Sequence, residues 1–327
     1  SVMTQARPAR CSGPSAPAWG AAWVYARLPT KAADDPPVEA TQLPVDDLLR
    51  FFEAGPDAPL FALLGRPVAH SISPRLHGGW MRRAGRAGLY LPLEIGTADE
   101  LAVVVRRLPA LGFRGANVTH PWKEAALGIA VRATASAREC GVANCLTFDA
   151  DGPSADNTDV AAAEQRLGEL RDVGHGPGGT VVVLGSGGAA RASVVAARRI
   201  GARPVVYGRN PAAVDRIVRE LGAERGDLSA PRPAPLVVHA TSVGREPADR
   251  LAVPLSALLA PGGYLLDWVY GAPDGEVARA AARAGAGYEG GERLLALQAA
   301  RSYERWWGAP PPAEGAGSHP AEVACAA

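Results

Sequence analysis

Residues 180–210 read TVVVLGSGGAARASVVAARRIGARPVVYGRN. The stretch opens on a run of branched apolar residues, 180–184, which is typical of a strand buried on both faces. A glycine-rich turn, Gly185–Ala190, follows at once and leads into residues with the composition of a helix. A second apolar run, 203–207, comes after that helix. This order predicts a βαβ unit with two parallel strands.

The turn has the spacing G-x-G-x-x-[GA] at Gly185, Gly187 and Ala190. Gly185 permits a tight turn, and Gly187 lets the backbone approach a pyrophosphate, whose charge the N-terminus of the helix meets. A chance glycine-rich turn has the same letters, but the placement between a strand and a helix makes the signal strong. We therefore expect a dinucleotide to bind at Gly185, Gly187, Gly188 and Ala189.

The end of the second strand indicates which dinucleotide binds. A carboxylate there would accept hydrogen bonds from the ribose hydroxyls of NAD. Here the strand ends in Arg209, and the next acidic residue is Asp215. A guanidinium can grip a 2′-phosphate with two hydrogen bonds. The sequence therefore favours NADP over NAD, and a solvated surface arginine is the alternative interpretation of Arg209.

Short apolar runs alternate with longer helical segments along most of the chain, which predicts an α/β fold of βα units with mostly parallel sheets. The runs that we expect to form further strands are 60–65, 89–95, 115–119, 143–148, 235–241 and 262–270. The segments that we expect to form helices are 74–85, 98–112, 121–140, 189–201, 210–222, 274–285 and 291–308.

Bulk composition narrows the class of protein. The 327 residues suffice for roughly two domains. Lysine plus arginine (34) nearly balances aspartate plus glutamate (33), so we expect neither nucleic acid nor an anionic membrane as partner. No apolar stretch approaches the roughly 20 residues of a membrane span. The four cysteines lack metal-ligand spacing, so we expect thiols in a reducing cytoplasm and no metal.

A second segment carries candidate chemistry. In GANVTHPWKEAAL, residues 115–127, a strand ends in Thr119 and Lys123 stands at the start of a helix. The helix dipole disfavours a cation there, so the lysine needs a partner or a use. A lysine beside a carboxylate can pass a proton to and from an alcohol oxygen. Asp159, in the NTD of 157–159, is the candidate carboxylate, and a surface lysine is the alternative.

Eight motifs in one order resemble the shikimate dehydrogenases, NADP-dependent enzymes that interconvert 3-dehydroshikimate and shikimate. The resemblance covers roughly residues 58–308. The motifs are HSISP (70–74), NVTHPWK (117–123), GVANCL (141–146), NTD (157–159), GSGGAAR (185–191), HATSVG (239–244), DWVY (267–270) and LLALQAA (294–300).

The resemblance implies roles for single residues. Ser71 and Ser73 match the pair that binds the substrate carboxylate, although serines at a strand end also serve as turns and caps. Lys123 and Asp159 match the catalytic pair. The remaining matches are Thr119, Asn144 and Gln298 near the ring hydroxyls, Tyr270 near the carboxylate and Thr241 beside the nicotinamide. Taken alone, Thr119 and Asn144 could be caps or turn residues, and Tyr270 a core residue.

Several positions depart from the pattern of that family. His239 stands where the family has asparagine, and Asp156 replaces a glycine. Arg245 and Arg293 stand where small or apolar residues line the cofactor cleft, which would weaken binding or change its geometry. Arg209 lacks the second nearby basic residue of the family, since the next arginine is Arg216.

The expected architecture has two domains. Residues 58–165 plus 285–308 would form an α/β substrate-binding domain, and 166–284 a Rossmann-like NADP-binding domain. The C-terminal helix would return to the substrate domain. Residues 1–57 faintly resemble the last strand and helix of a type I dehydroquinase barrel, a fragment or relic of a fusion, and 309–327 would be a disordered tail.

The expected function is that of a shikimate dehydrogenase, a monomer or homodimer. The alternatives are a quinate or aminoshikimate dehydrogenase, or a catalytically impaired homologue that binds shikimate for regulation. Ser73 argues mildly against a quinate enzyme, because relatives that prefer quinate often have threonine there.

Overall fold

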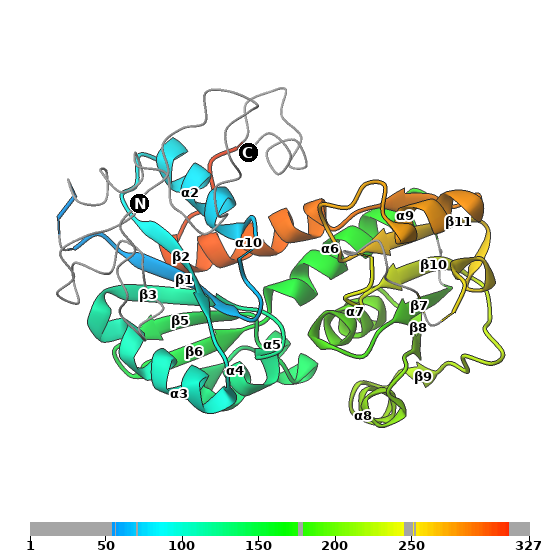
Figure 1. Cartoon of the computed structure of the whole chain (residues 1–327), viewed down its shortest axis with the longest axis horizontal. Coiled ribbons are helices and arrows are strands. Elements are labelled where there is room, and N and C mark those ends of the chain that lie inside the picture. The colour runs from blue at the N-terminus through cyan, green and yellow to red at the C-terminus, as the bar shows by residue number, and fades with distance from the viewer. Residues whose placement is uncertain are drawn as a thin grey trace, which may run out of the picture. The chain divides into compact units, whose positions relative to one another are not determined.

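The computed structural model describes residues 54–313 apart from 56, 70, 176–178, 245–250 and 252. The N-terminal extension up to residue 53, the tail from residue 314, His70 and Arg245 lie outside the described residues. The chain divides into two compact units, each with its own six-stranded sheet. Figure 1 labels most of the helices and strands of both units.

The first unit holds a mixed sheet of order β2-β1-β3-β5-β6-β4. Strand β1 pairs in parallel with β2 and β3, but β3 pairs antiparallel with β5. Two residues, Ala150 and Asp151, join β5 to β6, and a connection that short can only make a hairpin. The strands are β1 (Leu60–Gly65), β2 (Leu89–Glu94), β3 (Phe113–Val118), β4 (Arg132–Ala133), β5 (Cys145–Asp149) and β6 (Gly152–Asp156).

The sequence prediction of mostly parallel sheets is therefore wrong for this sheet. Strand β6 reads GPSAD, and four of these five residues, glycine, proline, alanine and aspartate, are depleted in strands, so no pattern signalled it. The helix expected over 121–140 is also wrong, because it is two helices separated by β4. Val131 there donates its N–H to the Pro153 carbonyl at 2.9 Å, and Thr134 caps the second helix.

Helices of the first unit are α2 (Ser73–Arg83), α3 (Ala98–Arg107), the 3₁₀ turn η2 (Leu108–Leu111) and α4 (Lys123–Ile129). The last residues of α10 (Glu292–Trp307), from Tyr303 on, also belong to this unit. Trp306 stacks on Phe61 of β1 with ring centroids 4.8 Å apart and donates its indole N–H to the Leu146 carbonyl at 3.0 Å. A Cβ at Gly115 would lie 2.2 Å from Trp306, so the indole requires glycine in β3.

The second unit holds a sheet of order β12-β11-β10-β7-β8-β9 in which every pairing is parallel. The predicted βαβ unit is present as β7, α7 and β8. The strands are β7 (Thr180–Leu184), β8 (Arg203–Tyr207), β9 (Glu224–Arg225), β10 (Ala234–His239), β11 (Leu259–Asp267) and β12 (Gly287–Glu289). The helices are α5 (Ala135–Cys140), α6 (Thr158–Asp172), α7 (Gly188–Arg199), α8 (Pro211–Leu221), η3 (Leu255–Ala257) and α9 (Glu276–Arg283).

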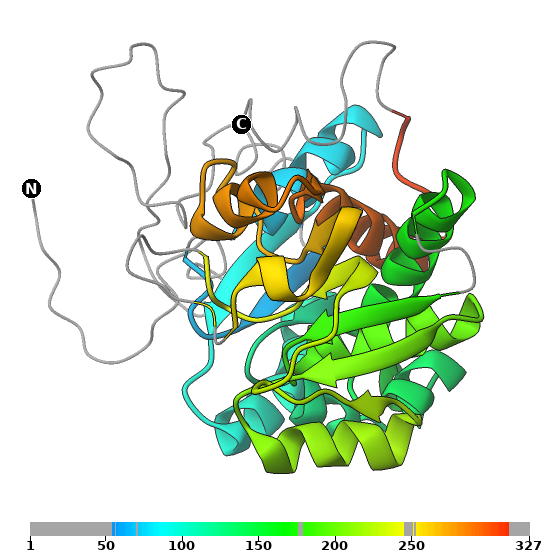
Figure 2. The same ribbon diagram turned by 90° about the vertical axis from the view of Figure 1, so that its right-hand side faces the viewer.

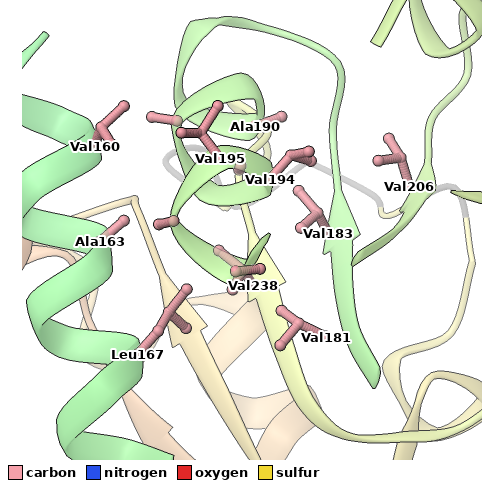
Figure 3. Close-up of a cluster of buried hydrophobic side chains, with 14 of the residues drawn as sticks. Val160, Ala163, Leu167, Val181, Val183, Ala190, Val194, Val195, Val206 and Val238 are labelled. Carbon is pink, nitrogen blue, oxygen red and sulfur yellow. The ribbon is translucent and has the colours of Figure 1, made fainter. Parts of the chain in front are cut away.

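Helices cover both faces of this parallel sheet (Figures 1 and 2). Val181 and Val183 of β7 join one buried cluster with α6 and α7, and Figure 3 shows those side chains meeting. Val182 and Leu184 join the opposite cluster, which includes Val277 of α9. Successive strand residues point to opposite faces, so a continuous apolar run supplies two cores.

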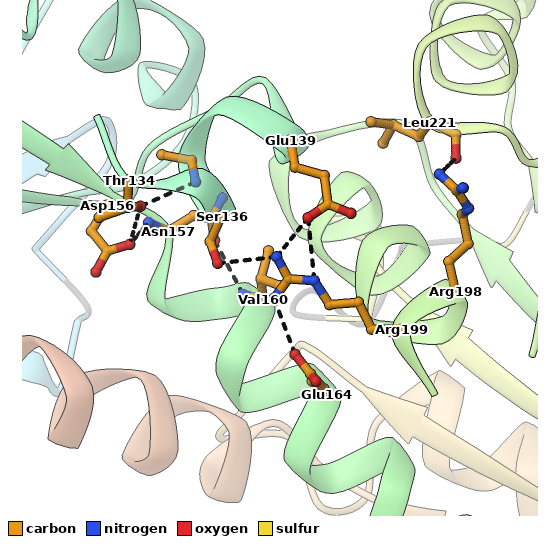
Figure 4. A network of polar contacts seen from close by, with 11 residues as sticks. Thr134, Ser136, Glu139, Asp156, Asn157, Val160, Glu164, Arg198, Arg199 and Leu221 are labelled. Carbon is orange, nitrogen blue, oxygen red and sulfur yellow. Dashed lines mark hydrogen bonds and ion pairs between the residues drawn. The ribbon is translucent and has the colours of Figure 1, made fainter. Parts of the chain in front are cut away.

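The two compact units differ in extent from the predicted domains. Residues 133–144, 156–165 and 285–302 fall in the second unit, although we expected them in the substrate-binding domain. The apolar face of α6 shares its core with α7, which explains part of the difference. Arg199 of α7 also binds Glu139 of α5 at 2.5 Å and Glu164 of α6 at 3.1 Å (Figure 4).

Candidate active site

The glycine-rich turn has the geometry of an anion site. Gly185 has φ +136°, and a Cβ there would lie 2.5 Å from the Ala240 carbonyl oxygen, so the turn after β7 packs directly on the loop after β10. Gly187 is the N-cap of the 12-residue α7, and a Cβ on Gly187 would meet nothing within 4 Å. Exposed backbone at the positive end of a helix fits a pyrophosphate. The residues present therefore fit a dinucleotide.

Arg209 lies exposed just after β8. Asn210 accepts the Ala213 N–H at 3.1 Å and so caps α8, which fixes where the chain turns beside Arg209. The nearest acidic residue after the strand, Asp215, forms an ion pair with Arg225 at 2.6 Å. That carboxylate is engaged, and the exposed group at the strand end is a cation.

A buried polar network in the second unit joins two predicted substrate residues, Asn144 and Gln298, to the predicted catalytic residue Asp159. The Asn144 amide nitrogen donates to Asp159 Oδ1 at 2.8 Å and to Gln298 Oε1 at 3.3 Å. Asn144 Oδ1 in turn accepts the backbone N–H of Thr158 at 2.7 Å. Asp159 stands in the first turn of α6, where the dipole stabilises a carboxylate. The three side chains are 3%, 3% and 8% exposed.

Two further residues, Thr158 and Ser302, belong to this network and were not among the predicted site residues. Thr158 Oγ1 contacts the Asn144 amide, Gln298 Oε1 and Ser302 Oγ. Ser302 donates to the Gln298 carbonyl at 3.1 Å. Thr158 lies inside the NTD motif and could have been found there. Ser302 follows the last motif by two residues, and no local pattern marks it.

The first unit holds three more of the predicted substrate residues, Ser71, Ser73 and Thr119. Ser71 and Ser73 are 9% and 5% exposed, and their hydroxyl oxygens lie 3.2 Å apart at the start of α2. Ser71 Oγ also accepts the Ser73 N–H at 3.3 Å, which is part of a helix-start role. Thr119 follows β3 and is half-buried, with its methyl group against Gly65.

Lys123 opens α4 as expected and is half-buried. It lies in the first unit and Asp159 in the second, so their pairing stays a prediction. Lys31 and Lys123 are the two lysines among 34 lysine and arginine residues. Arginine does not lose its proton in proteins, whereas lysine can. Because the chain has arginine at nearly all its basic positions, the lysine at position 123 is consistent with a role in proton transfer.

The loop after β10 carries a hydrogen-bond chain that sequence reasoning missed. His239 is fully buried, with Nδ1 2.7 Å from Asp267 Oδ1 and Nε2 2.6 Å from Thr241 Oγ1. Asp267 ends β11 and is paired in register with His239 across the two strands. Thr241, the predicted nicotinamide neighbour, is half-buried, as is Tyr270 after β11.

Arg293 does not stand unpaired in this structure. Its guanidinium donates to Glu169 Oε2 of α6 at 2.7 Å, and the same oxygen accepts from Arg166 at 3.0 Å. The side chain that we expected to disturb cofactor binding is thus held by a carboxylate. Asp156, the other departure, accepts from Thr134 Oγ1 and the Asn157 N–H and so stabilises the start of α6 (Figure 4).

Within the described residues, no group of three or more histidine, cysteine or acidic side chains has the arrangement of a metal site. None of the helices in that part of the chain is long and apolar enough to cross a membrane.

The parallel sheet with its strand, glycine turn and helix defines a Rossmann-type dinucleotide-binding protein with a second α/β unit. The family profile described as the shikimate dehydrogenase substrate binding domain matches residues 63–146. The NADP(+) shikimate dehydrogenase of Acidiphilium cryptum is 39% identical over 259 residues, 78% of this chain and 92% of that protein. The enzyme of the same name from Paracoccus denitrificans is 39% identical over 269 residues, with 78% and 92% covered.

A solved structure agrees with these sequence relatives. Thermus thermophilus shikimate 5-dehydrogenase, determined in complex with NADP(H) and shikimate, is 32% identical with a TM-score of 0.67 and covers 78% of this chain and 95% of its own. The chain belongs to the shikimate dehydrogenase family.

Proposed function

We propose that this protein is an NADP-dependent shikimate dehydrogenase, which reversibly reduces 3-dehydroshikimate to shikimate in aromatic amino-acid biosynthesis. The observation that carries the proposal is the buried network of Asn144, Asp159 and Gln298. It gathers groups that can pair with several ring hydroxyls, and a site of that kind rejects analogues that lack them. Family membership and the glycine-rich turn support the same conclusion.

Proton transfer is assigned to Lys123 and Asp159. In the reducing direction the Lys123 ammonium gives a proton to the carbonyl oxygen as that oxygen becomes a hydroxyl, and in the oxidising direction the amine takes it back. Asp159 stabilises the ammonium and accepts a hydrogen bond from the substrate hydroxyl. The nicotinamide cofactor supplies or accepts the hydride. Ser71 and Ser73 hold the substrate carboxylate, and Thr119 and Tyr270 complete its surroundings.

The cofactor would be held by this chain's own groups. Gly185, Gly187, Gly188 and Ala189 present backbone to the pyrophosphate at the start of α7. Arg209 meets the 2′-phosphate that distinguishes NADP from NAD. The ion pair of Asp215 with Arg225 supports this choice, because it leaves Asp215 without the role that a carboxylate has in NAD sites.

The proposal keeps the predicted organisation. We assign a substrate-binding domain to 58–165 plus 285–308 and an NADP-binding domain to 166–284. These domains are defined by their expected ligands, and their bounds differ from those of the compact units. We expect the enzyme to act in the cytoplasm as a monomer or homodimer, and size-exclusion chromatography with light scattering measures which.

The test is a spectrophotometric assay of the purified protein at 340 nm with shikimate or quinate, each with NADP or NAD. We expect turnover with shikimate and NADP. Turnover with quinate alone would overturn the substrate assignment, and turnover with NAD alone would overturn the role of Arg209. If no mixture gave turnover but calorimetry still showed shikimate binding, the proposed enzyme activity would be wrong, and the protein would be a regulatory protein that binds shikimate.

A further inference from the structure

The buried chain Asp267–His239–Thr241 has a defined direction. Asp267 Oδ1 accepts from the Val269 N–H at 2.9 Å as well as facing His239 Nδ1 at 2.7 Å. The Tyr288 hydroxyl lies 3.4 Å from Oδ2, and burial together with the Asp267 charge raises the pKa of Tyr288, so the phenol stays a donor. A carboxylate surrounded by donors accepts only, which places a hydrogen on His239 Nδ1.

The direction continues to Thr241. In the tautomer with its hydrogen on Nδ1, which we assign to His239, Nε2 is an acceptor, so the Thr241 hydroxyl 2.6 Å away donates to it. Thr241 Oγ1 already accepts the Val243 N–H at 3.1 Å. This arrangement gives each of the five hydrogens an acceptor. Thr241 Oγ1 then has one lone pair left with which it can accept a further hydrogen bond.

Thr241 stands where the reactive half of a dinucleotide would lie. It follows β10, which pairs with β7, and the loop that contains it packs under the glycine-rich turn at Gly185. In a parallel sheet of this kind the ligand spans the carboxyl ends of the strands at the point where the strand order reverses, here between β7 and β10. Arg209 marks the adenosine side at β8, which leaves the β10 side for the nicotinamide.

We propose that Asp267 and His239 fix the Thr241 hydroxyl as a hydrogen-bond acceptor for the carboxamide N–H of the nicotinamide. The proposal rests on the proposed function and makes Thr241 a specificity-determining residue and His239 a positioning residue. A nicotinamide carboxamide has an N–H that donates and a carbonyl oxygen that accepts. A threonine hydroxyl that is free to rotate could therefore pair with either group. A hydroxyl whose proton is committed to His239 selects the N–H.

Binding of cofactor analogues to the enzyme without substrate tests this selection. Calorimetry would compare NADP⁺ with its 3-acetylpyridine analogue, which lacks the carboxamide N–H, and with its thionicotinamide analogue, which keeps it. We expect the acetylpyridine analogue to bind roughly three- to tenfold more weakly than NADP⁺ and the thionicotinamide analogue to bind nearly as well. Equal binding of all three to the wild-type chain would overturn the proposal.

Variants separate Thr241 from its surroundings. The quantity compared is the dissociation constant of the 3-acetylpyridine analogue divided by that of NADP⁺. In Thr241→Val this ratio falls to about one. In His239→Asn the side-chain amide N–H can still donate to Asp267, but the shorter side chain cannot reach Thr241, so this variant lowers the ratio too. Ser242→Ala removes an exposed hydroxyl one residue away and leaves the ratio unchanged. A ratio that stays at the wild-type value in His239→Asn, or falls in Ser242→Ala, would overturn the assignment.

A spectroscopic readout checks the direction of the chain independently of binding. The ¹⁵N spectrum of the imidazole, assigned by its loss in His239→Asn, should show a protonated Nδ1 and an unprotonated Nε2. A proton on Nε2 would overturn the proposal. Failure to bind any NADP form would instead defeat the proposed function, and the two failures are thus distinguishable.

Discussion

The side-chain amide of Asn144 donates a 2.8 Å hydrogen bond to the carboxylate of Asp159, and Asn144 also accepts the N–H of the residue before that aspartate. One amide therefore fixes both the start of α6 and the direction of the carboxylate that we assign to catalysis. Thirteen residues further along the chain from Asn144, Asn157 makes a comparable pair of bonds at the same helix start, to Val142 and Val160. The two asparagines differ in what they orient.

Asn144→Ala should lower both activity and stability. It removes the side-chain acceptor of the Thr158 N–H and one donor to the Asp159 carboxylate, which costs about 1–3 kcal/mol of unfolding free energy. Because the substrate also loses a hydrogen-bonding group, we expect kcat/KM for shikimate to fall at least tenfold. Urea unfolding and the 340 nm assay measure the two effects.

Asn157→Ala is the matched control. It removes the N-cap of α6 and should cost about 1–2 kcal/mol of stability, but it touches none of the predicted substrate residues except through the helix start. We expect KM for shikimate to stay within about twofold of wild type, a range that a lost side-chain contact would exceed. A rise in KM equal to that of Asn144→Ala would mean that the network acts through helix stability alone.

Lys123→Arg tests proton transfer without removing charge. An arginine cannot release its proton near neutral pH, so kcat should fall about 10²- to 10⁴-fold, as for loss of a general acid or base. The kcat of Lys123→Ala should fall by a similar factor. The dissociation constant of NADP⁺, measured by calorimetry, should hardly change in either variant.

Lys31→Arg is the control for the Lys123 variants, because it converts the other lysine of the chain. Its kcat should match the wild type. If Lys123→Arg kept most of its activity, the ammonium would be serving as a charge and not as an acid and base.

The sequence carries the information for the second unit's central βαβ motif because every feature of it is local. The apolar run of β7, the glycines after it and Arg209 at the end of β8 lie within 30 residues. Asp267 and His239 meet only because β10 and β11 pair in register, and that register depends on how whole strands pack. Ser302 reaches Thr158 only through the placement of α10, so no motif could have named it. Asn144 and Gln298 came from resemblance, whereas Asp159 was already a candidate carboxylate for Lys123 on chemical grounds.

His77 should make stability depend on pH. Burial lowers its pKa to about 3, and the ring stacks on Tyr90 with centroids 4.4 Å apart. The unfolded chain binds a proton at this residue below about pH 6.5 whereas the folded chain does not. The contribution of neutral His77 to the free energy of unfolding is therefore fully present above pH 6.5. It is lost as the pH falls toward 3, at about 1.4 kcal/mol per pH unit.

His77→Phe keeps an aromatic ring against Tyr90 and removes the titration. Between pH 7.5 and 4.5 the variant should lose about 2–3 kcal/mol less unfolding free energy than the wild type. Urea denaturation of both proteins at the two pH values gives the difference, in which the carboxylates that both chains share cancel. Parallel losses would show that the folded protein protonates His77 in this range.

Arg209→Ala should change which cofactor binds. Loss of the guanidinium removes charge-assisted hydrogen bonds to a 2′-phosphate, each worth about 1.5–3 kcal/mol, so the dissociation constant of NADP⁺ should rise roughly 10- to 100-fold. NAD⁺ has no such phosphate, and its affinity should hardly move, which makes it an internal reference. Arg219→Ala removes another exposed arginine, at the far end of α8, and controls for net charge. Equal weakening of NADP⁺ and NAD⁺ in Arg209→Ala would mean that Arg209 shapes the turn before α8 and does not read the phosphate.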